Sequence, residues 1–122
     1  NDDRESLYST LELYEVVYKR TGIPIVFDYH HHGFCTGGVS EEEALKVAIS
    51  TWGDIKPVVH YSESRAIEYK NPKIRPHAHS DYVNGPVNDY GCDLDVMIEA
   101  KAKELALFGL QKLDAQRLPA AA

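Results

Sequence analysis

The sequence predicts an α/β fold with about three parallel strands and flanking helices. Short apolar runs rich in β-branched residues alternate along the chain with segments whose apolar residues recur at helical spacing. Strands separated by such segments pair in parallel, because each crossover returns the chain to the same end of the sheet. The 122 residues have the size of one domain, and no repeat or low-complexity linker divides them.

A helix is predicted over residues 10–20. Ser9 and Glu12 form a capping-box pattern, in which the hydroxyl and the carboxylate each satisfy a backbone N–H at the helix start. Gly22 favours the end of this helix. The apolar run 25–27 follows, and it is predicted to be the first buried strand.

The second helix and the second strand repeat this order. Ser40 and Glu43 form another capping box, and the apolar residues after them predict a helix that runs to about Trp52. Residues 57–61 are apolar until a histidine near the end, which predicts the second strand.

The last part of the chain begins with a long irregular stretch. Residues 62–92 are rich in proline, glycine and asparagine, which predicts a loop with room for a short helical piece, and loops of this length are often functional. Residues 94–100 are predicted to be the third strand and 102–113 a helix rich in Leu, Ala, Lys and Glu. Residues 114–122 are predicted to be a frayed tail.

The charge balance argues against a uniformly basic, nucleic-acid-binding surface. Lys and Arg number 13 against 19 Asp and Glu, for a formal net charge of -6. Glu68 is nevertheless the only acid within one cluster of four cations, Arg65, Lys70, Lys73 and Arg75. This loop is therefore either locally basic or a solvated linker with scattered cations.

The remaining composition favours an intracellular protein. No stretch approaches the ~18 consecutive apolar residues of a membrane-spanning helix, so we expect no membrane partner and no secretion signal. Cys35 and Cys92 have no metal-ligand spacing and are too few for a disulfide framework, so we expect free thiols in a reducing compartment.

An ionisable side chain ends each predicted strand on the same face. Side chains alternate between faces with period two, which places Asp28, His60 and Glu99 on one face and directs Val96 and Ile98 to the opposite, helix-covered face. The carboxyl ends of parallel strands form the rim where α/β proteins bind ligands. We therefore expect the three ionisable groups to converge there.

Two carboxylates and an imidazole are suitable ligands for Mn²⁺, Zn²⁺ or Fe²⁺. The spacing from Asp28 to His31 adds a fourth candidate, since a residue three positions on can fold back after the strand ends. The alternative is a set of hydrogen-bonded polar groups at a sheet edge.

Four motifs in order resemble those of UV damage endonucleases, relatives of endonuclease IV. They are Phe27-Asp28-Tyr29-His30-His31-His32, His60-Tyr61-Ser62-Glu63, His79-Ser80-Asp81-Tyr82-Val83 and Asp95-Val96-Met97-Ile98-Glu99-Ala100-Lys101. The opening Asn1-Asp2-Asp3 also resembles the segment that follows a strand with a metal-binding glutamate in that family. The resemblance covers nearly the whole chain.

This resemblance implies a (β/α)8 TIM barrel, of which residues 1–122 are a C-terminal half-barrel segment, because a complete barrel takes roughly 250 residues. The implied activity is cleavage of double-stranded DNA immediately 5′ to UV photoproducts by a cluster of divalent metal ions. Mn²⁺ is the expected ion, with Zn²⁺ or Mg²⁺ as alternatives. The implied location is nuclear in a eukaryote and cytoplasmic in a bacterium.

Carried over by position, the implied metal ligands, which act in catalysis through the metal, are Asp28, His31, His60 and Glu99, with His79 as a further ligand. His77 is the alternative to His79 because the loop aligns loosely. Lys73 and Arg75 are candidates for contact with DNA phosphates. Val58 stands where the family often has a lysine, sometimes carbamylated.

Two other functions are compatible with the same residues. A metal-dependent, sugar isomerase-like barrel also uses carboxylates and histidines at its rim. A half-barrel without catalytic activity could instead self-associate through its open sheet edge. The ordered motifs and the basic loop favour the endonuclease, and we expect the segment alone to be inactive.

Overall fold

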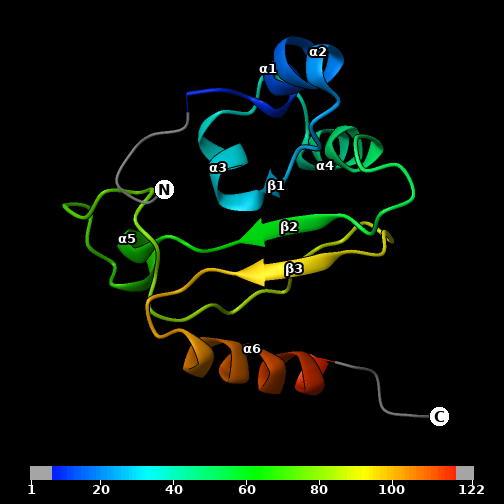
Figure 1. The fold of residues 1–122 in the computed structure, drawn as a ribbon. Coiled ribbons are helices and arrows are strands. Elements are labelled where there is room, and N and C mark those ends of the chain that lie inside the picture. The colour runs from blue at the N-terminus through cyan, green and yellow to red at the C-terminus, as the bar shows by residue number, and fades with distance from the viewer. Residues whose placement is uncertain (1–6, 118–122) are drawn as a thin grey trace.

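The computed structural model, described over residues 7–117, contains one sheet of three parallel strands in the order β1-β2-β3 (Figure 1). The strands are β1 (Phe27–Asp28), β2 (Val58–Tyr61) and β3 (Asp95–Ile98). The predicted α/β class with three parallel strands and flanking helices is therefore confirmed. The first strand is shorter than predicted and lies later, since residues 25 and 26 precede β1.

The helix predicted over residues 10–20 forms as three consecutive helical segments. These are α1 (Thr10–Leu13), a π-helical segment η1 (Tyr14–Tyr18) and α2 (Lys19–Thr21). The capping box of Ser9 and Glu12 is present, and Gly22 ends the series at φ 71°. The widening into a π turn is a feature that the apolar spacing did not predict.

Helix α4 (Glu41–Ser50) packs the sheet into the main core. Its buried residues Ala44, Leu45 and Ala48 lie against Phe27 of β1 and Val59 of β2. The helix ends two residues earlier than predicted. Beyond its end, Thr51 Oγ1 accepts a hydrogen bond from the Ile25 N–H, and Trp52 Nε1 donates one to the Ile25 carbonyl, which ties α4 to the chain entering β1.

Ser40 is expected to stabilise α4 measurably, because its hydroxyl accepts a hydrogen bond of 3.1 Å from the Glu43 N–H. Replacing it with alanine leaves that donor without its cap, so we expect the free energy of unfolding to fall by about 1 kcal/mol. Urea denaturation measures the change. Ser50→Ala at the other end of α4 is a control outside the cap, and an equal loss there would refute the capping contribution.

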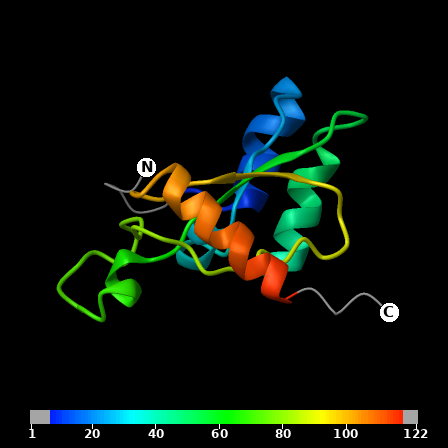
Figure 2. The same ribbon diagram turned by 90° about the horizontal axis from the view of Figure 1, so that it is seen from below.

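The crossover from β2 to β3 is mostly irregular, as predicted, with one short helix, α5 (Arg65–Glu68). Two carboxylates hold this loop. Glu63 accepts hydrogen bonds from the N–H groups of Asn84 and Gly85, and Glu68 accepts from those of residues 81 and 82. After α5 the chain passes back beside the helix α6 (Glu104–Arg117), as Figures 1 and 2 both show. Loop residues therefore cover the part of the sheet that a crossover helix would normally cover.

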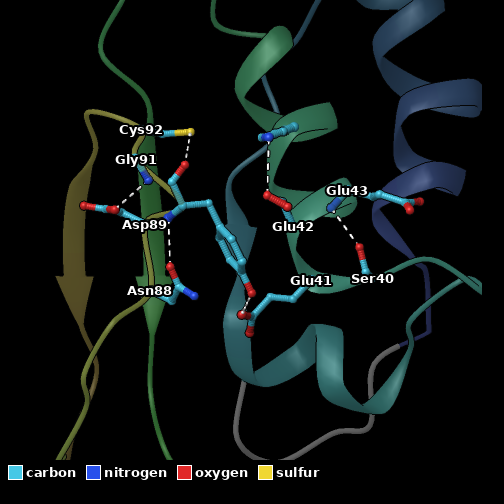
Figure 3. Close-up of polar contacts among 10 residues, drawn as sticks. Ser40, Glu41, Glu42, Glu43, Asn88, Asp89, Gly91 and Cys92 are labelled. Atoms are coloured by element: carbon cyan, nitrogen blue, oxygen red, sulfur yellow. Dashed lines mark hydrogen bonds and ion pairs between the residues drawn. The ribbon is translucent and has the colours of Figure 1, made fainter.

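The end of the crossover is fastened to the first turn of α4. The Tyr90 hydroxyl donates a hydrogen bond of 2.5 Å to Glu41, which raises the pKa of Tyr90 to about 12. Figure 3 shows the supporting contacts, in which Asn88 and Asp89 accept hydrogen bonds from backbone N–H groups of the same turn and Ser40 caps α4. This fastening sets the position from which the chain enters β3.

Two further helices differ from the prediction. A short helix, α3 (Tyr29–Phe34), begins directly after β1, in a stretch for which no helix was predicted. Helix α6 (Glu104–Arg117) begins and ends later than expected, so the prediction of a frayed tail is wrong for residues 114–117. Arg117 bonds to both Asp114 and the Asn84 carbonyl, which anchors this last turn. The rest of the predicted tail, and Asn1 to Asp3, lie outside the described residues.

The two faces of the sheet are covered differently. On the helix side Phe27 and Val59 are each 1% exposed, whereas Val26 and Met97 on the other face are 41% and 54% exposed. The expectation that Val96 lies under a helix is wrong, since 38% of it is exposed. Helix α6 packs Ala106 and Leu110 on Val83 and Ala100 instead, and Ile98 is the β3 residue that contacts this cluster. No helix among residues 7–117 is long and apolar enough to cross a membrane.

Candidate metal centre

Asp28, His60 and Glu99 meet at the carboxyl ends of the three strands. Asp28 is the register partner of His60, and Glu99 follows directly after Ile98, the partner of Tyr61. One ligand-type atom from each of the three side chains lies within 4.8 Å of the others. The convergence predicted from strand parity is therefore confirmed.

The three side chains face one another closely. His60 Nδ1 lies 2.6 Å from Glu99 Oε1 and 3.9 Å from Asp28 Oδ2. Glu99 Oε1 is shielded from solvent and makes no hydrogen bond to the described residues. Its short contact with His60 therefore does not have the geometry of a hydrogen bond. A shielded carboxylate oxygen without a hydrogen bond is costly, and a bound cation would remove that cost. The donor set of two carboxylates and an imidazole therefore fits a divalent metal ion.

Asp28 also starts helix α3. Its Oδ1 accepts a hydrogen bond of 2.9 Å from the His31 N–H, as a helix N-cap does, while Oδ2 faces the two histidines. This single turn of helix brings His31 back to the site, with Nε2 3.9 Å from Asp28 Oδ2. His31 therefore lies beside the group of three, where its spacing from Asp28 predicted it.

His79 reaches the site from the long loop. Its Nδ1 lies 3.8 Å from Glu99 Oε2, and the residue is only 8% exposed. An antiparallel bridge between Ser64 and His79 and the hydrogen bond from Lys101 N to Ser80 O hold this part of the loop against β2 and the end of β3. His77, the alternative, shows no such approach: its carbonyl accepts a hydrogen bond from His30 instead.

His30 supports the site in a way that sequence reasoning missed. Its Nε2 donates a hydrogen bond of 3.1 Å to the His77 carbonyl, and its ring lies 5.8 Å from that of His79. Burial lowers the pKa of His30, which favours the neutral ring as packing for the loop. The sequence signal for this role is that His30 directly precedes the candidate ligand His31.

The candidate DNA-contacting residues lie on the loop that leads to His79. Lys73 and Arg75 are both exposed, and Ala78 N donates to the Arg75 carbonyl in the turn just before His79. Lys56 lies near the opposite end of β2 and pairs with Asp93 and Asp95. Cys35 and Cys92 are free thiols, as expected.

Comparison with known proteins decides which family uses this arrangement. Residues 1–119 match the family model described as "UV-endonuclease UvdE". The chain belongs to this UV-endonuclease family. The resemblance identified from four motifs is thereby confirmed.

Curated members of the family show the same relationship over most of the chain. Proteins named "UV DNA damage endonuclease" from Bacillus cereus and Bacillus velezensis are 35% and 38% identical to it, each over 90% of this chain and 35% of their own length. The chain thus spans about a third of the length of these relatives.

A solved crystal structure of SacUVDE matches the fold with a TM-score of 0.72 and 27% sequence identity. The match covers 94% of this chain and 39% of that one. The three-stranded α/β unit is therefore consistent with part of the family's barrel.

Proposed function

We propose that the complete protein carrying this segment is a DNA repair endonuclease that cuts double-stranded DNA immediately 5′ to UV photoproducts. The observation that carries the proposal is the convergence of Asp28, His60 and Glu99 at one rim in a chain of the UV-endonuclease family. The relatives' printed names, "UV DNA damage endonuclease", support the substrate.

Asp28, His60 and Glu99 would hold a divalent metal ion, with His31 and His79 as further ligands beside them. Mn²⁺ is the proposed ion. When bound, it would act as a Lewis acid on the phosphodiester and supply a water of lowered pKa. Asp28 positions His31 through its N-cap bond, and Glu99 lies between His60 and His79, where it would share the ion with both.

The basic residues of the long loop have a separate proposed role. Lys73 and Arg75 are exposed on the segment that leads into His79, and cations placed there would bind DNA phosphates. The chain as a whole is acidic, so its net charge does not attract DNA. The attraction has to come from the local position of these cations.

We propose that residues 1–122 form a half-barrel segment that does not cut DNA alone. Val26 and Met97 lie on the face that carries the metal residues and are 41% and 54% exposed, whereas the interior of a closed barrel is filled by side chains. The remaining strands of the complete protein would cover this face. Isolated, the segment would associate through it or through its open sheet edge. For the complete protein we propose an intracellular location, where its DNA substrate lies.

Metal-dependent nicking tests the proposal directly. The complete protein is expected to nick a UV-irradiated plasmid in the presence of Mn²⁺ and to leave an unirradiated plasmid intact. EDTA should abolish the nicking, and adding Mn²⁺ in excess should restore it. Damage-specific cutting that persists unchanged in EDTA would refute the proposed metal dependence, and equal cutting of both plasmids would refute the specificity for UV damage.

A further inference from the structure

A hollow lies beside the metal residues, and the proposed function gives it no role. Its volume is about 330 Å³, and its lining includes His79, Glu99, Lys101 and Lys103. Two members of the candidate metal centre and two lysines therefore line the same hollow. Figure 1 shows that the turn between β3 and α6, which carries the lysines, lies at the carboxyl ends of the strands, on the same side as α5.

The turn that carries the lysines is held firmly. Lys101 N donates a hydrogen bond of 2.9 Å to the Ser80 carbonyl, and Ala102 N donates one of 3.0 Å to the Asp81 carbonyl. These bonds attach the turn to the segment that carries His79. The hollow is consequently built on the same backbone contacts that bring His79 to Glu99.

Lys103 occupies a backbone position at which lysine is unfavourable. Its φ is 56°, in the left-handed region, where a residue with a Cβ is less stable than glycine by about 1 kcal/mol. Among the residues that the structure describes, Lys103 is exposed and has no ion-pair partner. Lys103 therefore forms no ion pair that would stabilise the fold, and its backbone conformation destabilises the turn. Binding of an anionic ligand would explain why a lysine stands at this position.

Lys101 and Lys103 line the same hollow as His79 and Glu99. Both lysines thus lie next to the site where the proposed function places a scissile phosphodiester. A DNA strand that has one phosphate at the metal residues places its neighbouring phosphates next to that site, because each strand carries one phosphate about every 3.4 Å along the helix axis.

We propose that this hollow, the lysine hollow, binds a backbone phosphate that neighbours the one held at the metal centre. The ligand is a phosphodiester of the DNA strand, and Lys103 and Lys101 are its cationic partners. The inference deepens the proposed function and rests on it for the identity of the substrate. It assigns DNA binding to residues outside the basic loop of Lys73 and Arg75.

The test measures how the affinity of the complete protein for a short duplex depends on salt, in EDTA so that no strand is cut. A lysine that neutralises one phosphate contributes about 0.9 to the slope of log affinity against log salt concentration. We expect Lys103→Gln to reduce the slope by about 0.9, and Lys101→Gln with Lys103→Gln to reduce it by about 1.8 (2 × 0.9). Irradiated and unirradiated duplexes should lose affinity alike, because phosphate contacts do not depend on the bases.

Three variants separate binding from folding. Lys103→Arg keeps the charge and should keep the slope. Lys103→Gly relieves the strain of the left-handed backbone, so this variant should fold at least as stably as the parent. It should still show the slope reduced by about 0.9, because the charge is gone. The control is Lys112→Gln, which lies inside α6 about 13 Å along the helix axis from Lys103, and it should leave the slope unchanged.

An unchanged slope in Lys103→Gly would overturn the proposal, since that variant cannot be dismissed as misfolded. Titration with inorganic phosphate is the second measurement. If Lys103→Gln loses phosphate binding but keeps the slope for DNA, the hollow takes a free anion and the proposal is overturned. Failure of the proposed function is distinguishable: the parent would then bind DNA with the lysine-dependent slope but would not nick an irradiated plasmid.

Discussion

Replacing His60 with alanine is expected to lower the rate of nicking of UV-damaged DNA by at least about 100-fold, since disturbing even the groups that support metal ligands costs up to this factor. His60 is the central member of the group, 2.6 Å from Glu99 and 3.9 Å from Asp28. Without the imidazole, the carboxylates of Asp28 and Glu99 face each other and the site has lost its nitrogen ligand. Steady-state nicking of an irradiated plasmid and Mn²⁺ binding by calorimetry measure the two consequences.

The fold should survive this substitution, because the His60 side chain is 39% exposed. Lys56→Ala is a suitable control, since Lys56 lies near the opposite end of β2 and pairs only with exposed acids there. We expect that variant to retain its nicking rate within about twofold, as surface substitutions usually have small effects. Normal Mn²⁺ binding and normal nicking by His60→Ala would show that the metal centre has been placed wrongly.

Phe27→Ala is expected to give the largest loss of stability. The ring is 1% exposed and lies against Tyr29 in an edge-on contact, with a centroid distance of 4.9 Å. Truncation leaves a cavity between β1 and α4, for which the usual cost is about 3 to 5 kcal/mol. Since domains are stable by only about 5 to 15 kcal/mol, the variant should unfold at a markedly lower urea concentration.

Urea denaturation measures this loss. If the slope of the free energy of unfolding against urea concentration is unchanged, the lower midpoint reports lost stability and not a change in the compactness of either state. Ile67→Ala provides the comparison, because Ile67 is 78% exposed on α5 and its truncation should change the free energy of unfolding by less than about 0.5 kcal/mol. Equal midpoints for the two variants would contradict the assignment of Phe27 to the core.

Local sequence signals were sufficient for most of the elements. The capping boxes at Ser9 and Ser40 act between residues three positions apart, so both helix starts could be predicted. Strand parity was sufficient for Asp28, His60 and Glu99, because the carboxyl ends of parallel strands lie at one edge of the sheet. The short helix α3 was missed, since a histidine triplet followed by glycine has weak helical preference and the Asp28 cap alone starts the turn.

The sequence by itself determined the α/β class, the order of the elements and the three residues that meet at the rim, because periodicity and spacing act over a few residues. Only the tertiary structure decided that His79 rather than His77 approaches Glu99, that Val96 lies uncovered at the edge, and that Lys103 lines a hollow beside the metal residues. These outcomes depend on contacts between segments far apart in the chain, such as the bridge between Ser64 and His79, for which no local pattern of residues exists.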